Sequence, residues 1–208
     1  MPDRDRRDDG RPEQARPRDR TGRPLPYDTT GVALTENHEP ETVEEALQLG
    51  IGLWSEQRFF EAHECLEAVW HAAPVQDRDL WQGVIQLAVA GVHLQRGNLG
   101  GARAILDKAA ERLAKYPQER RGIDVATARR TCAELRAALD DPSAPTPGPE
   151  LLAVFPQTSR GAWYSPDAAA LEPPASPTPV PDEPVWLEAA RRRAPTRGEA
   201  SARPDDAR

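Results

Sequence analysis

The amino-acid sequence predicts an all-α protein, in which a compact bundle of about five helices lies between two disordered, Pro-rich tails. Of the 22 prolines in the 208-residue chain, 6 fall in residues 1–40 and 14 in residues 142–208, which leaves 2 for the 101 residues between them. The apolar residues of this middle region recur with the spacing of a helix, and no stretch alternates with the period of two that strands show. Because proline interrupts helices, we expect a disordered leader over residues 1–40, a helical domain over residues 41–141 and a disordered Pro/Ala-rich tail over residues 142–208. No sheet is predicted.

The middle region contains amphipathic segments that end at turn or cap residues. They predict helices over residues 42–57, 59–71, 77–97, 99–116 and 124–139. The third segment is apolar on nearly all sides, so we expect it to be the central helix of the bundle. Asp77 is the candidate N-cap of this helix, and Gly97 is the candidate glycine that ends it.

The first four predicted helices contain a faint internal repeat. Aligning Ala62 with Ala102 superimposes two units of helix, short turn and helix, at an offset of 40 residues. The pattern is similar to tetratricopeptide repeats, which have a period of about 34 residues and a turn glycine that Gly97 matches but Gln57 does not. Two such hairpins are too few for a solenoid. We therefore expect a closed bundle built from two helical hairpins plus a C-terminal helix.

Charge and composition exclude several classes of function. The net charge is -7 and no region is strongly basic, so nucleic-acid binding by the folded domain is not expected. The longest stretch without a formal charge, residues 80–95, has 16 residues, which is short for a membrane span. The N-terminus lacks the apolar core of a secretory signal, and Cys65 and Cys132 form no disulfide framework. We expect a cytoplasmic protein with no membrane partner.

One face of the second predicted helix mixes polar and aromatic side chains. At about 100° per residue, His63, Glu64 and Glu67 share this face with Phe60 and Trp70. A solvated face would not carry the two aromatic residues, and a core face would not carry the imidazole and the carboxylates. Burying such polar groups without partners costs about 1–3 kcal/mol each, so the mixture indicates a polar centre.

The third predicted helix carries a second polar seam. Gln82, Gln86 and His93 lie along one side of a helix that is otherwise apolar. Because this helix is predicted to be central, its seam is predicted to be buried and to face the polar residues of the second helix.

Both helices resemble a known family. The run His63-x-x-x-Glu67-x-x-Trp70 is followed by a Gln-rich apolar helix that ends in Gly97-Asn98. Together they resemble the bacterial and archaeal family of uncharacterised proteins known as domain of unknown function 309, over about residues 43–115. The resemblance implies a small all-helical bundle with metal binding at the motif. No activity is established for the family.

The first functional hypothesis is a metal-binding domain, which includes a metal-dependent enzyme of unknown substrate. His and Glu at positions i and i+4 of a helix converge on one point, and this donor set suits zinc, iron or manganese. The ligands would be His63, Glu67, Glu64 and His93, with Trp70, Gln82 and Gln86 as further binding or orienting residues. Such a set leaves a coordination position for water.

The alternative is a helical-hairpin protein-interaction module in which the seam is a structural polar network. A protein partner would then bind a groove of the domain or the C-terminal tail, where residues 185–194 combine aromatic, apolar and basic side chains. Residues 151–157 are apolar enough to fold back on the domain as a strap. The sequence also leaves open whether the protein forms a homodimer.

Overall fold

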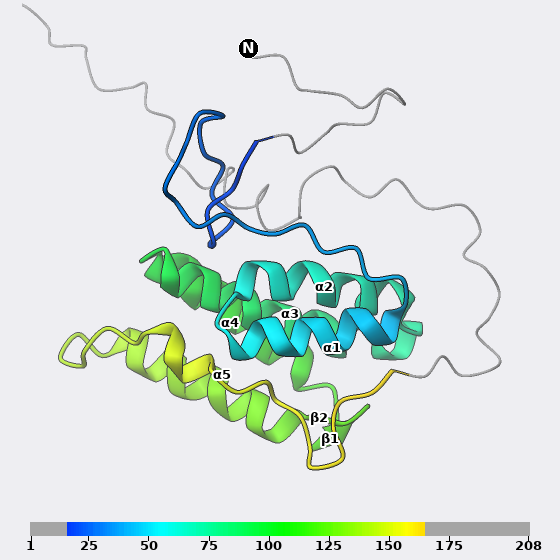
Figure 1. Cartoon of the computed structure of the whole chain (residues 1–208). Helices are drawn as coiled ribbons and strands as arrows, with labels where there is room; N and C mark the ends of the chain where they lie inside the picture. The colour runs from blue at the N-terminus through cyan, green and yellow to red at the C-terminus, as the bar shows by residue number, and fades with distance from the viewer. Residues whose placement is uncertain (1–15, 165–208) are drawn as a thin grey trace, which may run out of the picture. The chain divides into compact units, whose positions relative to one another are not determined.

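The computed structural model describes residues 16–164, and within this range the fold is all-α (Figure 1). Its helices are α1 (Val43–Ser55), α2 (Phe59–Ala72), α3 (Val75–Gln95), α4 (Leu99–Leu113) and α5 (Val125–Asp140). Each segment predicted as a helix is helical, with ends that differ by less than one turn. Consecutive helices pack side by side, from α1 on α2 to α4 on α5. The predicted bundle of two helical hairpins plus a C-terminal helix is confirmed.

Side-chain caps explain where three of these helices begin. Thr42 and Glu45 form a capping box at α1, in which Thr42 Oγ1 accepts from the Glu45 N–H at 3.1 Å. Asn98 Oδ1 accepts from the Gly101 N–H at 2.9 Å at the start of α4, and Asp124 caps α5 in the same way. These acceptors satisfy backbone N–H groups that have no partner inside the helix.

The start of α3 differs from the prediction. The helix begins at Val75, directly after Pro74, so Asp77 is not its N-cap. The Asp77 carboxylate is buried and accepts from Arg120 Nε at 2.7 Å and from Arg121 Nε at 2.6 Å. The two guanidinium groups therefore hold the carboxylate that the sequence assigned to capping.

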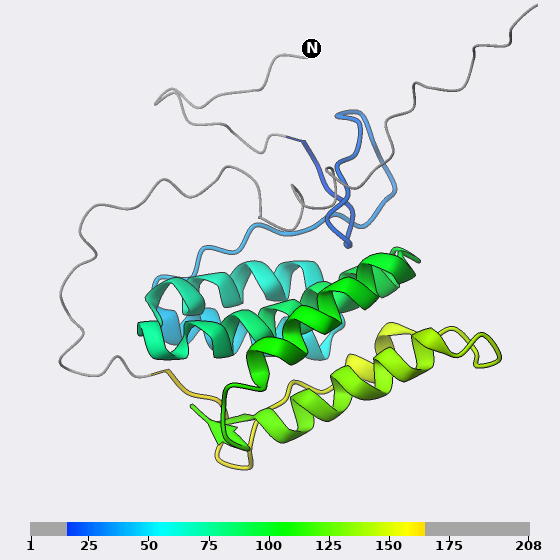
Figure 2. The same ribbon diagram turned by 180° about the vertical axis from the view of Figure 1, so that it is seen from behind.

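A small hairpin between α4 and α5 also differs from the prediction that no sheet forms. Strands β1 (Glu119–Arg120) and β2 (Ile123–Asp124) pair antiparallel. Strands of this length are too short to show alternation, and the turn is formed by Arg121 and Gly122, whose φ angles are 52° and 70°. The view from behind shows the hairpin at the start of α5, with α5 beside α4 (Figure 2).

The two helical hairpins repeat the same turn. At the end of α1 the Gln57 N–H donates to the Trp54 carbonyl at 2.8 Å, and at the end of α3 the Gly97 N–H donates to the Leu94 carbonyl at 2.9 Å. Gln57 and Gly97 both have positive φ angles, 57° and 67°. The repeat noted in the sequence thus extends to backbone conformation, with Gln57 at a position that favours glycine.

The core is centred on α3. Residues 80–94 of this helix are all buried except Gln82. Trp54, Phe59 and Trp81 are among the largest fully buried side chains, as expected for core aromatic residues. The prediction that the third helix is the most buried one is confirmed.

The packed domain extends past its predicted C-terminal boundary. A short 3-10 helix, η1 (Pro149–Leu152), leads into an irregular segment in which Leu152 and Phe155 are buried. The Trp54 indole N–H donates to the Leu152 carbonyl at 2.5 Å, which fastens this segment to α1. The prolines are compatible with a short 3-10 turn and an extended chain that packs on the bundle, so the segment folds back as a strap.

The described part of the N-terminal segment also lies against the bundle, although the sequence predicted a disordered leader there. Gly22 is buried, and the Thr21 carbonyl accepts from the Arg96 guanidinium. The Glu36 N–H donates to the Glu61 carboxylate at 2.8 Å. These contacts are made by backbone and charged groups. They therefore produce no periodic pattern of apolar residues from which the sequence could predict them.

All described residues belong to one compact unit. No helix among residues 16–164 is long and apolar enough to cross a membrane. The segment predicted to bind a protein partner, residues 185–194, lies outside the described residues.

Candidate functional site

The motif residues of α2 lie at different depths. His63 is buried, with 2% of its surface exposed. Glu67 and Trp70 are half-buried, and Glu64 is exposed. One edge of this face, at His63, is therefore in the interior and the other edge, at Glu64, is at the surface. This agrees with the mixture of polar and aromatic residues on the face.

His63 is held in a defined tautomer. Its Nδ1 lies within hydrogen-bond distance of the Phe60 carbonyl, and a carbonyl can only accept, so Nδ1 carries the proton. The lone pair is then on Nε2. Burial lowers the pKa of His63 to about 4, so the ring is neutral at pH 7. A neutral ring with Nδ1 bonded to a backbone carbonyl is the form in which histidine usually binds metals.

His93 is held in the opposite tautomer. Asn98 Oδ1 accepts from the Gly101 N–H, which turns Asn98 Nδ2 toward His93 Nδ1 at 3.0 Å. An amide nitrogen can only donate, so His93 Nδ1 accepts and the proton is on Nε2. Burial lowers the pKa of His93 to about 4 as well. Of the two histidines, His63 therefore has the tautomer suited to an Nε2 ligand.

The two motif carboxyls titrate close to neutral pH. Burial raises the pKa of Glu67 to about 7. Partial desolvation, followed by the charge of Glu67, raises the pKa of Glu64 to about 7. Burial acts alone at Glu67, whereas the charge of Arg18 offsets part of the rise at Glu64.

The glutamines of α3 face a different element from the one predicted. Gln82 Oε1 accepts from Arg112 Nε at 2.9 Å, and Gln86 Oε1 accepts from Arg112 Nη1 at 3.2 Å. Arg112 belongs to α4, so this part of the seam faces α4, which corrects the prediction that it faces the polar residues of α2. Helical periodicity does not show which side of α3 is covered by α4, so Arg112 could not be predicted as the partner. Gln82 and Gln86 thus belong to a hydrogen-bonded network between α3 and α4.

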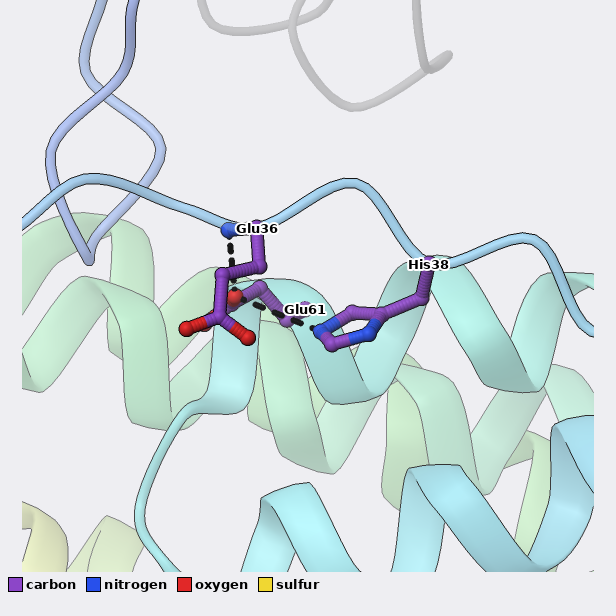
Figure 3. A group of neighbouring side chains, drawn as sticks. All are labelled: Glu36, His38 and Glu61. Atoms are coloured by element: carbon purple, nitrogen blue, oxygen red, sulfur yellow. Dashed lines mark hydrogen bonds and ion pairs between the residues drawn. The ribbon is translucent and has the colours of Figure 1, made fainter.

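A second imidazole–carboxylate cluster joins the N-terminal segment to α2 (Figure 3). Ligand atoms of Glu36, His38 and Glu61 lie within 4.8 Å of one another. Glu36 and His38 are two residues apart in an extended segment, so their side chains point to the same side. Both reach Glu61, which lies in the first turn of α2 and is fully buried.

Arg58 neutralises the buried carboxylate of this cluster. Its Nε donates to Glu61 Oε2 at 2.8 Å and its Nη2 donates to Glu61 Oε1 at 2.5 Å. The same Nη2 lies 3.0 Å from a carboxylate oxygen of Glu36. Burial alone would raise the pKa of Glu61, but the hydrogen bonds from Arg58 and from the Glu36 N–H lower it. Glu61 is therefore ionised at neutral pH.

The His38 ring is not satisfied by this arrangement. Its Nε2 lies 3.5 Å from Glu61 Oε1, yet this atom is buried and has no hydrogen-bond partner among residues 16–164. His38 also lines an open groove, together with residues that include Pro40, Glu45 and Leu49. A buried nitrogen without a partner is a site where a bound ion or water would be stabilised.

Within residues 16–164, this cluster alone brings three carboxylate, imidazole or thiol ligand atoms within 4.8 Å of one another. The four ligands predicted from the sequence do not form such a set, so their role as metal ligands stays a prediction. The cluster was not predicted because Glu36 and His38 fall in the segment predicted to be disordered, and Glu61 is not among the residues of the predicted polar face of the second helix. The spacing Glu36-x-His38 before Pro40 was the signal available.

Fold and side chains together define a small helical-hairpin domain with buried imidazole and carboxylate groups near α2. Residues 47–105 match the family described as Domain of unknown function (DUF309). The uncharacterized protein YpuF of Bacillus subtilis (strain 168) is 45% identical over 49 residues, which are 23% of this chain and 28% of YpuF. The chain thus aligns with less than a third of its relative. The family suggested by the motif and the Gln-rich helix is confirmed.

Proposed function

We propose that this domain binds a divalent transition metal ion through Glu36, His38 and Glu61. The observation that carries the proposal is the buried His38 Nε2, which has no hydrogen-bond partner among the described residues and lies 3.5 Å from Glu61 Oε1. Glu61 is ionised, as a metal ligand must be.

The spacing of the two donor atoms suits a shared ion. Ligands at about 2.0–2.2 Å from a tetrahedral zinc ion lie about 3.4 Å apart. The separation of His38 Nε2 and Glu61 Oε1 is 3.5 Å. One imidazole with two carboxylates favours zinc, iron or manganese, and three protein ligands leave a position for water. An ion with an open position supports hydrolytic or redox chemistry.

Arg58 limits how tightly the ion is held. Its guanidinium group already neutralises one of the two carboxylates, so a net charge of about one negative unit remains when His38 is neutral. The ion also competes with Arg58 for the oxygens of Glu61. We therefore expect micromolar rather than nanomolar affinity.

The family motif on the same helix is the rival position for the metal ion. Its support is the tautomer of His63, which directs a lone pair to Nε2, together with a half-buried carboxyl at Glu67. His93 is held in the tautomer that does not offer Nε2, so His63 and Glu67 are the stronger members of the predicted set.

The rival function is a structural one, in which the polar groups only hold the helices together and the domain binds a protein partner. The hydrogen bonds of Arg112 to Gln82 and Gln86 favour it for the α3–α4 seam. Two contacts of Glu36 favour it for the cluster, because its ion pair with Arg58 and the hydrogen bond from its N–H to Glu61 fasten the N-terminal segment to α2 without an ion.

Metal content and metal-dependent stability separate these functions. Untagged protein purified without chelator is analysed for bound metals, and its melting temperature is measured with micromolar zinc, manganese or iron(II). The proposal predicts a metal-dependent rise in the wild type that is lost in His38→Gln and reduced in Glu36→Gln, because a ligand stabilises only the state that binds it.

The matched controls are His63→Gln and Glu67→Gln. If the Glu36/His38/Glu61 cluster is the site, both keep the rise. If His63→Gln and Glu67→Gln lose it while His38→Gln keeps it, the metal lies at the family motif and the proposal is wrong. If the wild type contains no bound metal and its melting temperature does not change with added metal, the metal proposal is wrong and the structural function becomes the better account.

A further inference from the structure

Positive charge gathers where the N-terminal segment meets the end of α3. Arg18 and Arg23 belong to a tight turn of this segment, and Arg96 is the residue that ends α3. The turn lies close to the bundle, because a Cβ atom added to Gly22 would stand 2.0 Å from the ring of Phe60. In Figure 1 the dark blue turn descends to the bundle on the side where α2 starts.

The three arginines contact backbone and hydroxyl oxygens rather than carboxylates. Arg18 Nη1 donates to the Gly22 carbonyl at 2.8 Å, and Arg23 Nη2 donates to the Arg96 carbonyl at 3.1 Å. Arg96 donates to the carbonyl and to the hydroxyl of Thr21. None of the three guanidinium groups has a carboxylate oxygen within 4.0 Å in residues 16–164, in contrast to the paired Arg58 and the pair that binds Asp77.

The carboxylate in this cluster is already used. Asp19 Oδ1 accepts from the Thr21 N–H at 2.9 Å, from the Thr21 hydroxyl at 2.7 Å and from the Arg23 N–H at 3.0 Å. Asp19 therefore shapes the turn instead of pairing with a guanidinium group. Glu64 is close enough for its charge to interact with Arg18, but it too is beyond salt-bridge distance.

The like charges are close enough to oppose one another. Burial, and after it the positive charges of Arg23 and Arg18, lower the pKa of Arg96. The charge of Arg96 in turn contributes to the low pKa values of His63 and His93. Arg18 Nε is buried and has no hydrogen-bond partner among the described residues. The negative charge of Asp19 offsets part of the effect on Arg96. A buried donor without a partner, beside three guanidinium groups that no described carboxylate pairs with directly, favours a bound anion.

We propose that Arg18, Arg23 and Arg96 form a binding site for a small phosphate-type oxyanion. Guanidinium groups bind phosphate oxygens through paired, charge-assisted N–H bonds, and most N–H groups of these three side chains are not used by protein acceptors. The net charge of -7 opposes the approach of a long polyanion, whereas a small dianion is attracted by the local cluster. The site is separate from the proposed metal cluster.

Calorimetric titration of the full chain with inorganic phosphate tests this inference. A chelator is present so that metal phosphates do not form, and sodium chloride of equal ionic strength is the reference. We expect saturable phosphate binding that weakens by about tenfold or more in Arg18→Gln and in Arg23→Gln, because charge-assisted hydrogen bonds are lost. The matched control is Arg129→Gln, which removes one exposed positive charge from α5.

Circular dichroism establishes whether each variant is folded. Because Arg23 is exposed, Arg23→Gln is expected to disturb the packing of the domain little. The inference is overturned if the wild type shows no saturable binding up to millimolar phosphate, or if Arg129→Gln loses as much affinity as the other two variants. It is also overturned if a single-stranded oligonucleotide binds more tightly than phosphate with a steep salt dependence, since the cluster would then be part of a nucleic-acid surface.

Discussion

Arg58 and Glu61 form the most constrained charge pair of the candidate metal site. Only 12% of the Arg58 side chain and none of the Glu61 side chain is exposed. Removing one partner of such a buried pair costs about 3–5 kcal/mol, because the other charge is left without compensation. The Arg58 guanidinium group thus lies where the metal ion is proposed to bind. We expect each of these two cations to be able to replace the other beside Glu61.

Arg58→Gln should therefore behave differently with and without metal. Without metal we expect a loss of about 3–5 kcal/mol in the free energy of unfolding. Zinc or manganese should then raise the melting temperature more in the variant than in the wild type, because the ion replaces the lost charge. Thermal denaturation with chelator and with metal measures both values. A variant that is destabilised and does not respond to metal would contradict metal binding at Glu61.

Glu67 makes stability depend on pH in a defined direction. Burial raises its pKa from 4.5 to about 7 in the folded protein. The folded state holds a proton that the unfolded state has lost, so this contribution is complete below about pH 4.5 and disappears as the pH rises through about 7. Glu67→Gln has no such contribution to lose.

Glu67→Gln should therefore gain stability relative to the wild type between about pH 5 and about pH 8. The difference in melting temperature between Glu67→Gln and the wild type is measured with chelator. It should increase as the pH rises, by about 2–4 °C for each kcal/mol of difference in the free energy of unfolding. His63 and His93 have lowered pKa values and act with the opposite sign, but they are present in both proteins and cancel. The control is the exposed Glu111→Gln. A difference independent of pH would show that Glu67 is ionised in the folded state.

At the scale of the elements, the strap after α5 is expected to stabilise the bundle. Phe155 is buried and packs edge-on against Trp54, with ring centroids 5.2 Å apart. Phe155→Ala should lower the free energy of unfolding by about 3–5 kcal/mol. The neighbouring Val154 is 84% exposed, so Val154→Ala should change it by less than about 0.5 kcal/mol. Urea denaturation of both variants measures the difference, and equal values would show that the strap does not pack in solution.

The helices could be predicted from the sequence because each carries a continuous apolar period. The central position of α3 followed from apolar residues on all its sides, and Gly97 marked its end. The strap and the N-terminal segment could not be predicted in the same way. They bind through single apolar side chains such as Phe155 and through backbone groups such as the Glu36 N–H, and neither produces a period.

The candidate site was predicted only in part. The polar face of α2 was identified, but its residues divide between the interior and the surface in a way that spacing alone does not specify. The cluster of Glu36, His38 and Glu61 depends on an extended segment that crosses the start of α2, a contact between residues 25 positions apart. The partner of Gln82 and Gln86 depends on which side of α3 is covered by α4, and helical periodicity does not determine that choice.

At the scale of the whole molecule, residues 18–38 link both proposed sites to the helical bundle. One end of this segment brings Arg18 and Arg23 to the end of α3, and the other brings Glu36 and His38 to the start of α2. The family match covers residues 47–105, which include all of α2 and α3, whereas these four side chains come from before it. Ion binding is thus proposed to depend on how this segment is held against the bundle.

The most direct test of the metal site is nuclear magnetic resonance of the imidazole nitrogens during a zinc titration. The protein has 4 histidines, His38, His63, His71 and His93, so the spectrum of histidine-labelled protein is simple, and His38→Gln assigns one ring. We predict that the His38 Nε2 signal moves to the range of metal-bound nitrogen while His63 keeps its chemical shifts. A shift of His63 Nε2 with His38 unchanged, or no shift of any ring nitrogen at saturating zinc, would contradict metal binding by Glu36, His38 and Glu61.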